Sequence, residues 1–517
     1  MRGAIAAGHP LTAEAGARML VAGGNAVDAC IAAGLASWVT ESPLTGPGAG
    51  GFMLVHRARD GASRLLDFFA AVPGLGREGP PGEMDEVDVL YGESTQIFKI
   101  GAASVAVPGV PAGLEAAHRA YGSLPFPTLA EPALELARGG FELTPAQEYL
   151  HAILDLILRR EDSGRAIYGV EEPQVAGDRF GIPELAETIE RLVTHGADDL
   201  YRGGELGRAL VSHVSAGGGE LTARDLAEYR VIWRRPVRSP FRGTEFVSNP
   251  PPSSGGLLIG LALRLLDDAP SGEPGSAEAI ATLVAVMREM TRARRGSFAA
   301  ELYRGGLPAR LYADAALAAS RARVRARETG LAESAAPGGT THISVVDGRG
   351  NAASLSASTG SGSGVIVPGT GIHLNNMLGE YDLAGGLPVK PGRRLTSMMA
   401  PSIALADGAP RLVLGSAGSI RLRGAILQVA VNVLGHGLPV EEAISAPRVH
   451  LEEPKVHCEG GHDPAELDRL EALGYEVTRW QVQNLYFGGV AAVAVNEDGE
   501  LAAAGDPRRG GHGIVVD

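Results

Sequence analysis

The stretch Gly338-Gly339-Thr340-Thr341-His342-Ile343-Ser344-Val345-Val346-Asp347 lies two thirds of the way along the 517-residue chain. From Thr341 the residues alternate between polar and apolar, which is typical of a half-buried strand. A threonine therefore opens a strand directly after two glycines. This placement suits a chemistry in which the chain is cut before Thr340 and the freed α-amine becomes the base for the neighbouring hydroxyl. Turns of this composition are also common, so these residues alone leave both interpretations open.

The composition predicts a cytoplasmic globular protein and argues against several partners. A formal net charge of −14 argues against a nucleic-acid partner. The apolar run at the start is too short for a signal peptide, and no run of 18 apolar residues occurs, so we expect no membrane partner. Two cysteines, Cys30 and Cys458, make no disulfide framework. No metal cluster stands out among the 13 histidines, so we expect neither a metal nor a cofactor.

The periodicity predicts helices before Thr340 and mainly strands after it. Helices are expected at 10–21, 25–39, through 117–118 and over most of 129–266, with strands at 52–56 and 63–69 and a polar loop at 79–92. Residues 305–339 are expected to form a helix that runs into an exposed connector. Later strands are expected at 351–358, 365–367, 372–374, 399–405 and 410–414, and a helix at 421–434.

Two glycine-rich stretches were candidates for anion binding. Gly46–Gly51 precedes a strand and has no Walker lysine, so its context predicts a tight turn and not a phosphate loop. Gly415–Ser419 precedes the predicted helix at 421–434. The unpaired N–H groups at a helix start suit an anion or a developing oxyanion, although many helices begin in this way without a catalytic role.

Several motifs in one order resemble the γ-glutamyltransferase (glutathione hydrolase) family of N-terminal-nucleophile hydrolases across nearly the whole chain. They are His9-Pro10-Leu11, Gly23-Gly24-Asn25-Ala26-Val27-Asp28-Ala29, Gly50-Gly51-Phe52-Met53-Leu54, Pro250-Pro251-Pro252-Ser253-Ser254-Gly255-Gly256, Thr340-Thr341-His342, Leu374-Asn375-Asn376, Ser397-Met398-Met399-Ala400-Pro401 and Asp506-Pro507-Arg508.

The resemblance implies an α+β fold, a four-layer αββα sandwich made from a precursor that cleaves itself between Gly339 and Thr340. A large subunit, 1–339, and a small subunit, 340–517, would then stay together as one domain, with further oligomerisation left open. A small-molecule amide or peptide would be the substrate. The resemblance also places the enzyme in glutathione metabolism.

The resemblance further implies roles for individual residues. Thr340 would be the nucleophile, its own amine the base, and Ser358 the hydroxyl that hydrogen-bonds the nucleophile. The N–H groups of Gly418 and Ser419 would form the oxyanion hole. The predicted substrate-binding residues are Glu380 for the α-amino group, Thr396 and Ser397 for the α-carboxylate, and the neighbouring Asn376, Met377 and Phe69.

The same comparison shows departures at the substrate pocket. Phe69 stands where typical members carry an arginine that clamps the α-carboxylate, and Met377 replaces a glutamine. The loop after Ser358 is two residues shorter than in the family, and only 15 residues separate Glu380 from Thr396. The sequence therefore predicts intact chemistry with an altered pocket, in which Arg393 or Arg394 is the candidate replacement for the clamp.

Three functions follow from these residues. The first is a family amide hydrolase or acyltransferase that acts on a γ-glutamyl or related side-chain acyl amide through an ester on Thr340. The second is an acylase for a non-glutamyl group, such as a dicarboxylic or β-lactam side chain. The third is a non-catalytic binding protein on the same fold, against which the intact Thr340 argues. A serine hydrolase is disfavoured because the chain has no G-x-S-x-G elbow.

Overall fold

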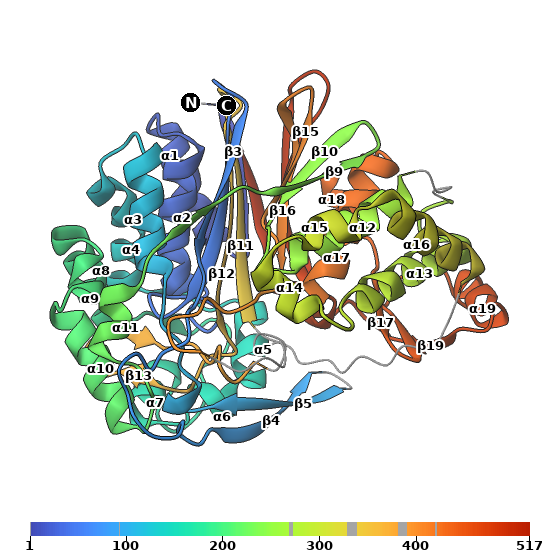
Figure 1. Ribbon diagram of the computed structural model, residues 1–517. Coiled ribbons are helices and arrows are strands. Elements are labelled where there is room, and N and C mark those ends of the chain that lie inside the picture. Colours follow the sequence, from blue (N-terminus) through green and yellow to red (C-terminus); the bar gives the residue numbers. More distant parts are fainter. Residues whose placement is uncertain (1, 92–93, 268–271, 328–338, 381–389, 419–420) are drawn as a thin grey trace.

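Two β-sheets lie face to face at the centre of the protein, and helices cover the outer face of each sheet (Figure 1). The structure is a computed structural model that describes residues 2–91, 94–267, 272–327, 339–380, 390–418 and 421–517. The order of layers is helix, sheet, sheet, helix, so the fold is the expected four-layer αββα sandwich.

The first sheet carries the predicted nucleophile on one of its inner strands. It has seven strands in the order β22-β1-β11-β12-β2-β3-β8, and neighbouring strands are antiparallel. Their bounds are His512–Val516 (β22), Gly3–Ala7 (β1), Gly339–Asp347 (β11), Ala352–Gly360 (β12), Gly50–Arg57 (β2), Ala62–Phe68 (β3) and Ile232–Arg234 (β8). Strands from both sides of the predicted cleavage point therefore pair with one another within one sheet.

The second sheet has six strands in the order β21-β20-β16-β15-β10-β9. Their bounds are Leu501–Gly505 (β21), Gly489–Val495 (β20), Ala409–Ala417 (β16), Ser402–Ala406 (β15), Thr244–Ser248 (β10) and Val237–Phe241 (β9). Smaller sheets pair β4 (Asp85–Tyr91) with β5 (Ser94–Ile100), β6 (Phe141–Glu142) with β7 (Arg179–Phe180), β13 (Ile366–Val367) with β14 (Ile372–His373), and β17 (Val449–Glu452) with β18 (Lys455–Cys458) and β19 (Glu476–Arg479).

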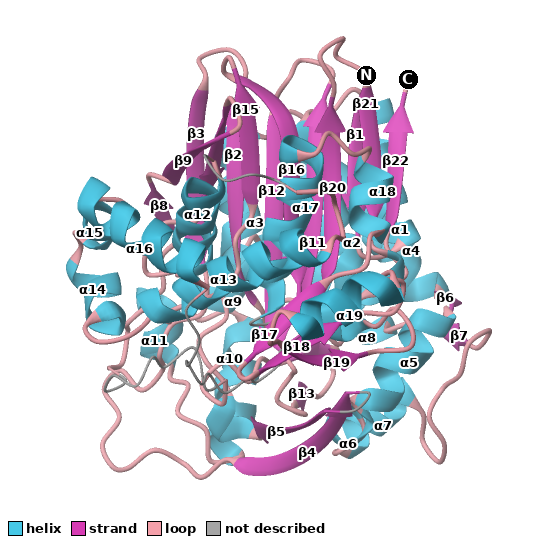
Figure 2. Ribbon diagram, turned by 90° about the vertical axis from the view of Figure 1, so that its right-hand side faces the viewer, coloured by secondary structure: helices cyan, strands magenta, loops and turns pink. Residues whose placement is uncertain are grey.

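The two helical layers come from different parts of the chain (Figures 1 and 2). Over the first sheet lie α1 (Pro10–Val21), α2 (Ala26–Thr40), α3 (Val110–Tyr121), α4 (Phe126–Gly139) and α8 (Pro183–His195). Over the second lie α12 (Gly255–Leu266), α13 (Ala277–Ala293), α17 (Leu422–Ala430) and α18 (Val440–Ser445). The remaining helices are α5 (Pro145–Ile153), α6 (Asp155–Leu158), α7 (Asp162–Tyr168), α9 (Asp198–Tyr201), α10 (Glu205–Ala216), α11 (Ala223–Glu228), α14 (Phe298–Arg304), α15 (Leu307–Leu311), α16 (Asp314–Ala326) and α19 (Pro464–Ala472).

Alternation along the strands divides the core into two parts. On β2, Met53 and Val55 belong to the apolar cluster under α1 to α4, whereas Phe52 and Leu54 belong to the cluster between the sheets. Because successive side chains of a strand point to opposite faces, both faces of this sheet are buried. The N-terminal end of β11 is thus held inside the sandwich from both sides.

Parts of the expected secondary structure were wrong. The predicted loop at 79–92 contains β4, in which the acidic residues Asp85, Glu86 and Asp88 precede the buried Val89 and made the segment look like a loop. The predicted helical region at 129–266 also contains β8, β9 and β10. In the range 305–339, helices α15 and α16 extend to Ala326, and residues 328–338 of the expected connector lie outside the described residues.

Candidate active site

Thr340 lies at the start of β11 and is almost fully buried. The pairing of β11 with β12 slips at this point, since Gly339 lies opposite Gly360 but Thr341 lies opposite Ala357. Such an irregularity interrupts the regular ladder and re-aims the side chain at that position. The local sequence thus places a threonine at a break in an otherwise regular strand.

Ser358 is brought directly to the bond before Thr340. Its hydroxyl donates a hydrogen bond to the carbonyl oxygen of Gly339, and its Oγ accepts one from the N–H of Gly360 at 2.9 Å. A donor on this carbonyl oxygen would stabilise negative charge that develops there during attack on the Gly339 carbonyl carbon. The predicted neighbour of the nucleophile therefore contacts the predicted cleavage point.

Gly418 follows the last residue of β16, a strand that packs against β11. Its φ is +121°, a backbone conformation that residues other than glycine rarely adopt. A Cβ atom at this position would lie 2.9 Å from the Cα atom of Gly488. The preceding residue, Ala417, lines the same cavity as Thr340. The predicted helix starts at Leu422, and the other predicted oxyanion residue, Ser419, lies outside the described residues.

Two of the predicted substrate-binding residues, Asn376 and Glu380, lie beside Gly360, which pairs with Gly339. A Cβ atom on Gly360 would lie 2.1 Å from Asn376 Oδ1 and 3.1 Å from Glu380 Oε1, so both side chains face the residue opposite Gly339. Asn376 also accepts a hydrogen bond from the N–H of Ser361 at 2.9 Å, which fixes its amide. Glu380 is therefore a carboxylate candidate within the site.

Met377 is placed differently from these neighbours. It is 2% exposed and belongs to the apolar cluster between the sheets. Its N–H donates to Asn375 Oδ1 at 3.1 Å, while Asn375 Nδ2 donates to the carbonyl oxygen of Gly48 at 2.7 Å. These contacts give Met377 a packing role and give Asn375 the role of holding the loop.

Phe69 lies near Ser358 but is covered by the core. Its ring stacks on Phe52 with centroids 5.3 Å apart, and only 1% of the residue is exposed. A Cβ atom on Gly50, the partner of Ser358 across the ladder, would lie 3.2 Å from the edge of this ring. Phe69, at the position predicted to lack the clamping arginine, is therefore an apolar ring packed in the core beside Ser358.

Thr396 and Ser397 follow a segment that pairs with the chain beside Phe69. The N–H of Leu395 donates to the carbonyl oxygen of Ala70 at 3.0 Å. Ser397 Oγ accepts a hydrogen bond from the N–H of Met399 at 3.0 Å. Both residues are buried, at 5% and 3% exposure, so they can meet a substrate only inside the site.

The candidate replacement clamps are engaged elsewhere. Arg394 Nε lies 3.2 Å from Asp67 Oδ1, and its guanidinium donates to the carbonyl oxygens of Phe69, Asp67 and Arg230. The guanidinium carbon of Arg393 lies 3.5 Å from the centre of the Tyr303 ring. Arg394 therefore stabilises the segment around Phe69, and a role as clamp would require it to leave these partners.

A small cavity of about 40 Å³ lies beside Thr340 and contains groups to which the sequence assigned no role. It is lined by Glu41, Thr341, His9, His151, Arg508 and Arg509. The hydroxyl of Thr341 donates to Glu41, which is separated from it by 300 positions in the sequence. His9 and Arg508 belonged to the motifs that carried the resemblance, whereas no local pattern singled out Glu41.

Asp506 and Arg508, which line this cavity, belong to a buried ionic cluster. Asp506 Oδ2 accepts from Arg448 Nη2 at 2.6 Å, and Asp506 Oδ1 lies 3.2 Å from Arg508 Nη1. Arg508 Nε also donates to Glu459 Oε1 at 2.6 Å. Burial alone would raise the pKa of Asp506, but the charges of Arg448 and Arg508 outweigh it and hold the pKa below its usual value.

We expect the Asp506→Ala substitution to lower the free energy of unfolding by about 3 to 5 kcal/mol, because it leaves two buried guanidinium groups without their shared partner. Urea unfolding of the uncleaved Thr340→Ala chain would measure this as the unfolding of one polypeptide. As a control, Asp468→Ala removes a carboxylate that is 71% exposed and paired with Arg479, and should cost about 1 kcal/mol or less. Equal losses in both variants would contradict the role of the cluster.

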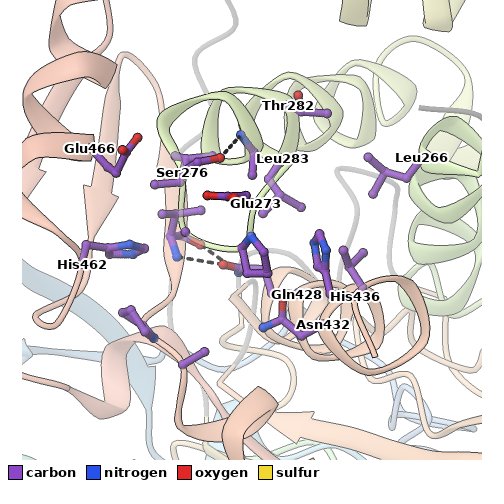
Figure 3. A pocket seen from close by; sticks show the side chains of 18 of the residues that line it. Leu266, Glu273, Ser276, Thr282, Leu283, Gln428, Asn432, His436, His462 and Glu466 are labelled. Atoms are coloured by element: carbon purple, nitrogen blue, oxygen red, sulfur yellow. Dashed lines mark hydrogen bonds between the residues drawn. The ribbon is translucent and has the colours of Figure 1, made fainter. Parts of the chain in front are cut away.

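A larger cavity, about 420 Å³, lies apart from these residues (Figure 3). Ser276, Gln428, His436, His462 and Glu466 are among its lining residues, and none of the predicted site residues that the structure describes lines it. Among the described residues, no group of three or more histidine, cysteine, aspartate or glutamate side chains could hold a metal ion. Within the same part of the chain, no helix is long and apolar enough to cross a membrane.

Comparison with known proteins decides the family. A sequence profile described as Gamma-glutamyltranspeptidase matches residues 12–516. The chain belongs to the γ-glutamyltranspeptidase family. It is thus an enzyme with the N-terminal-nucleophile hydrolase fold, and its activity is that of an amide hydrolase or acyltransferase of this family.

Relatives of this γ-glutamyltranspeptidase-family enzyme carry two kinds of name. The Acylase ACY 1 proenzyme of a Pseudomonas species is 32% identical, and the alignment covers 100% of this chain and 94% of the relative. The Glutathione hydrolase proenzyme of Escherichia coli is 31% identical, with 98% and 90% covered. Both names describe proenzymes.

Two solved structures agree with the fold. The cephalosporin acylase from Bacillus halodurans superposes with a TM-score of 0.85 at 24% identity, covering 99% of this chain and 95% of that one. The γ-glutamyltranspeptidase from Pseudomonas nitroreducens superposes with a TM-score of 0.53 at 27% identity, covering 62% and 94%.

Proposed function

We propose that this γ-glutamyltranspeptidase-family enzyme cuts itself between Gly339 and Thr340 and then uses Thr340 as an acyl-accepting nucleophile. The observation that carries the proposal is the hydrogen bond from Ser358 to the Gly339 carbonyl, beside a buried threonine. Attack of Thr340 Oγ1 on that carbonyl carbon forms an ester and breaks the peptide C–N bond, which frees the α-amine of Thr340. Water then hydrolyses the ester and releases the large subunit from the nucleophile.

In each later turnover, the freed amine accepts the proton of Thr340 Oγ1 as the oxygen attacks the acyl carbon of an amide substrate. The N–H groups of Gly418 and Ser419 stabilise the oxyanion, and the leaving amine of the substrate takes the proton. Water or a second amine then removes the acyl group from Thr340. Residues 1–339 and 340–517 remain together because strands of both lie side by side in both sheets.

The acyl group is the point on which the two candidate activities differ. Relatives named glutathione hydrolase and acylase are about equally similar to this chain. The stacked rings of Phe69 and Phe52 and the engaged guanidinium of Arg394 favour an acyl group without an α-carboxylate. Glu380, Thr396 and Ser397 would still contact polar groups of a γ-glutamyl substrate and permit weak turnover of it.

We expect kcat/KM on a 4-aminobutyryl anilide, which differs from a γ-glutamyl anilide only by the missing α-carboxylate, to exceed that on the γ-glutamyl anilide by tenfold or more. Loss of a charge-assisted hydrogen bond costs roughly 1.5 to 3 kcal/mol, which corresponds to about tenfold to a few hundredfold in affinity. Phe69→Arg should reduce the ratio of these two kcat/KM values. Phe69→Leu is the apolar control and should leave the ratio unchanged. A wild-type preference for the γ-glutamyl anilide would refute the acylase assignment and leave the family activity in place.

A further inference from the structure

Glu41 connects the start of β11 to the first two helices. It lies directly after α2, and one carboxyl oxygen accepts a hydrogen bond from the hydroxyl of Thr341, the residue that follows the proposed nucleophile. The other oxygen accepts from Thr12 Oγ1 of α1 at 3.0 Å, and Thr12 Oγ1 lies 2.7 Å from Thr40 Oγ1. A chain of hydroxyl and carboxyl groups thus ends one residue from Thr340.

The surroundings of Glu41 make its charge sensitive to pH. The residue is 7% exposed, and burial raises its pKa to about 7, although the bonds from Thr341 and Thr12 and the charge of Arg509 oppose this. The titratable and charged groups that face the cavity from the packed elements are His9, His151, His342, Asp506, Arg508 and Arg509.

These other groups keep one charge state near neutral pH. Burial lowers the pKa of His9 and His151 to about 4 and that of His342 to about 3, so all three are neutral at pH 7. Asp506 is held ionised by its arginine partners. Glu41 is therefore the described group in this cavity whose charge changes close to pH 7.

We propose that Glu41 is a positioning residue that holds Thr340 in place through the hydroxyl of Thr341 and sets the pH range in which the amine of Thr340 acts as a base. The proposal rests on the proposed function of Thr340. Neither motif spacing nor the assigned roles of the other site residues require an acid at this position.

The physical effect follows from the charge of the carboxyl group. An ionised Glu41 accepts a hydrogen bond from the Thr341 hydroxyl and attracts a positive charge at the Thr340 amine, so it raises the pKa of that amine. A protonated Glu41 donates to Thr341 instead and adds no negative charge to the cavity. The Thr340 amine must be neutral to accept the hydroxyl proton, so the rate falls at low pH where the amine is protonated. Because the charge of Glu41 affects the amine, the carboxyl group and the amine titrate as a coupled pair, and this pair determines the pH at which kcat/KM falls.

The test compares pH profiles of kcat/KM for cleaved wild-type and Glu41→Gln enzymes. Glutamine keeps the hydrogen-bonding shape but cannot ionise, so we expect the acid limb to move to lower pH by about one unit. Glu289→Gln is the matched control, since Glu289 is a buried carboxylate of α13 paired with Arg323 at 2.6 Å and does not line the cavity beside Thr340. Its profile should superimpose on that of the wild type.

Thr341→Val gives an independent measurement of positioning, because it removes the link and leaves Glu41 in place. We expect the appearance of the two subunits, followed from synthesis onward, to slow by tenfold or more. A Glu41→Gln profile identical to that of the wild type would overturn the pH role. Cleavage of Thr341→Val at the wild-type rate would overturn the positioning role. Failure of the proposed function would appear separately, as an uncleaved but active wild-type chain.

Discussion

The Thr340→Ala protein is expected to remain one polypeptide and to lose turnover by a factor on the order of a million, the loss typical of removing a nucleophile. Without Oγ1, no atom at this position can attack the Gly339 carbonyl that Ser358 contacts. The free amine, which serves as the base, is then never formed. A denaturing gel and N-terminal sequencing would show one band for the variant, and two bands with threonine at the new N-terminus for the wild type.

Thr340→Ser is the control for this experiment because it keeps a hydroxyl on a side chain of similar size. It should cleave and retain part of the activity, which would show that the alanine variant failed for lack of the hydroxyl. A wild-type protein that stays in one piece and still turns over substrate would disprove the assignment of Thr340.

Gly418→Ala is expected to lower kcat by about a hundredfold or more while self-cleavage proceeds. Its φ of +121° and the 2.9 Å approach of a Cβ atom to Gly488 mean that the backbone must shift to accept a methyl group. Loss of one oxyanion donor typically costs about 10² to 10³ in kcat. Cleavage should persist because its oxyanion forms on Gly339, where Ser358 is the donor.

Gly437→Ala separates this effect from the general cost of a left-handed residue. Gly437 has a φ of +72°, and a Cβ atom there would meet nothing within 4 Å. This control should lose some stability and keep its kcat. If both variants keep wild-type turnover, Gly418 has no part in stabilising the oxyanion.

The sequence predicted those parts of the site that depend on local pattern. The alternation after Thr341 gave the strand β11, and the turn at Asp347 with the return strand carried Ser358 to the same end of the sheet. The four-layer αββα arrangement could be expected only from the resemblance, because no local sequence pattern shows how strands form sheets or how two sheets pack against each other. The short strands β9 and β10 were missed inside a region of strong helical periodicity.

Contacts between distant positions were the part that sequence reasoning could not reach. Glu41 and Thr341 meet across 300 positions, and a glutamate directly after a helix has no feature that marks it as buried. The position of Phe69 was predicted to matter, but its stacking on Phe52 depends on how β2 and β3 pair. The engagement of Arg394 with Asp67 likewise required the folded chain.

The pairing of β1 with β11 and β22 has a consequence for how the chain is made. Residues 3–7 are synthesised before both of their partners, which are residues 344–347 on one side and 512–516 on the other. Contacts at such sequence separations form late in folding. The first sheet therefore cannot be completed before residue 516 has been synthesised, and a cut at Thr340 that requires this sheet would occur only in molecules in which β22 has already paired with β1.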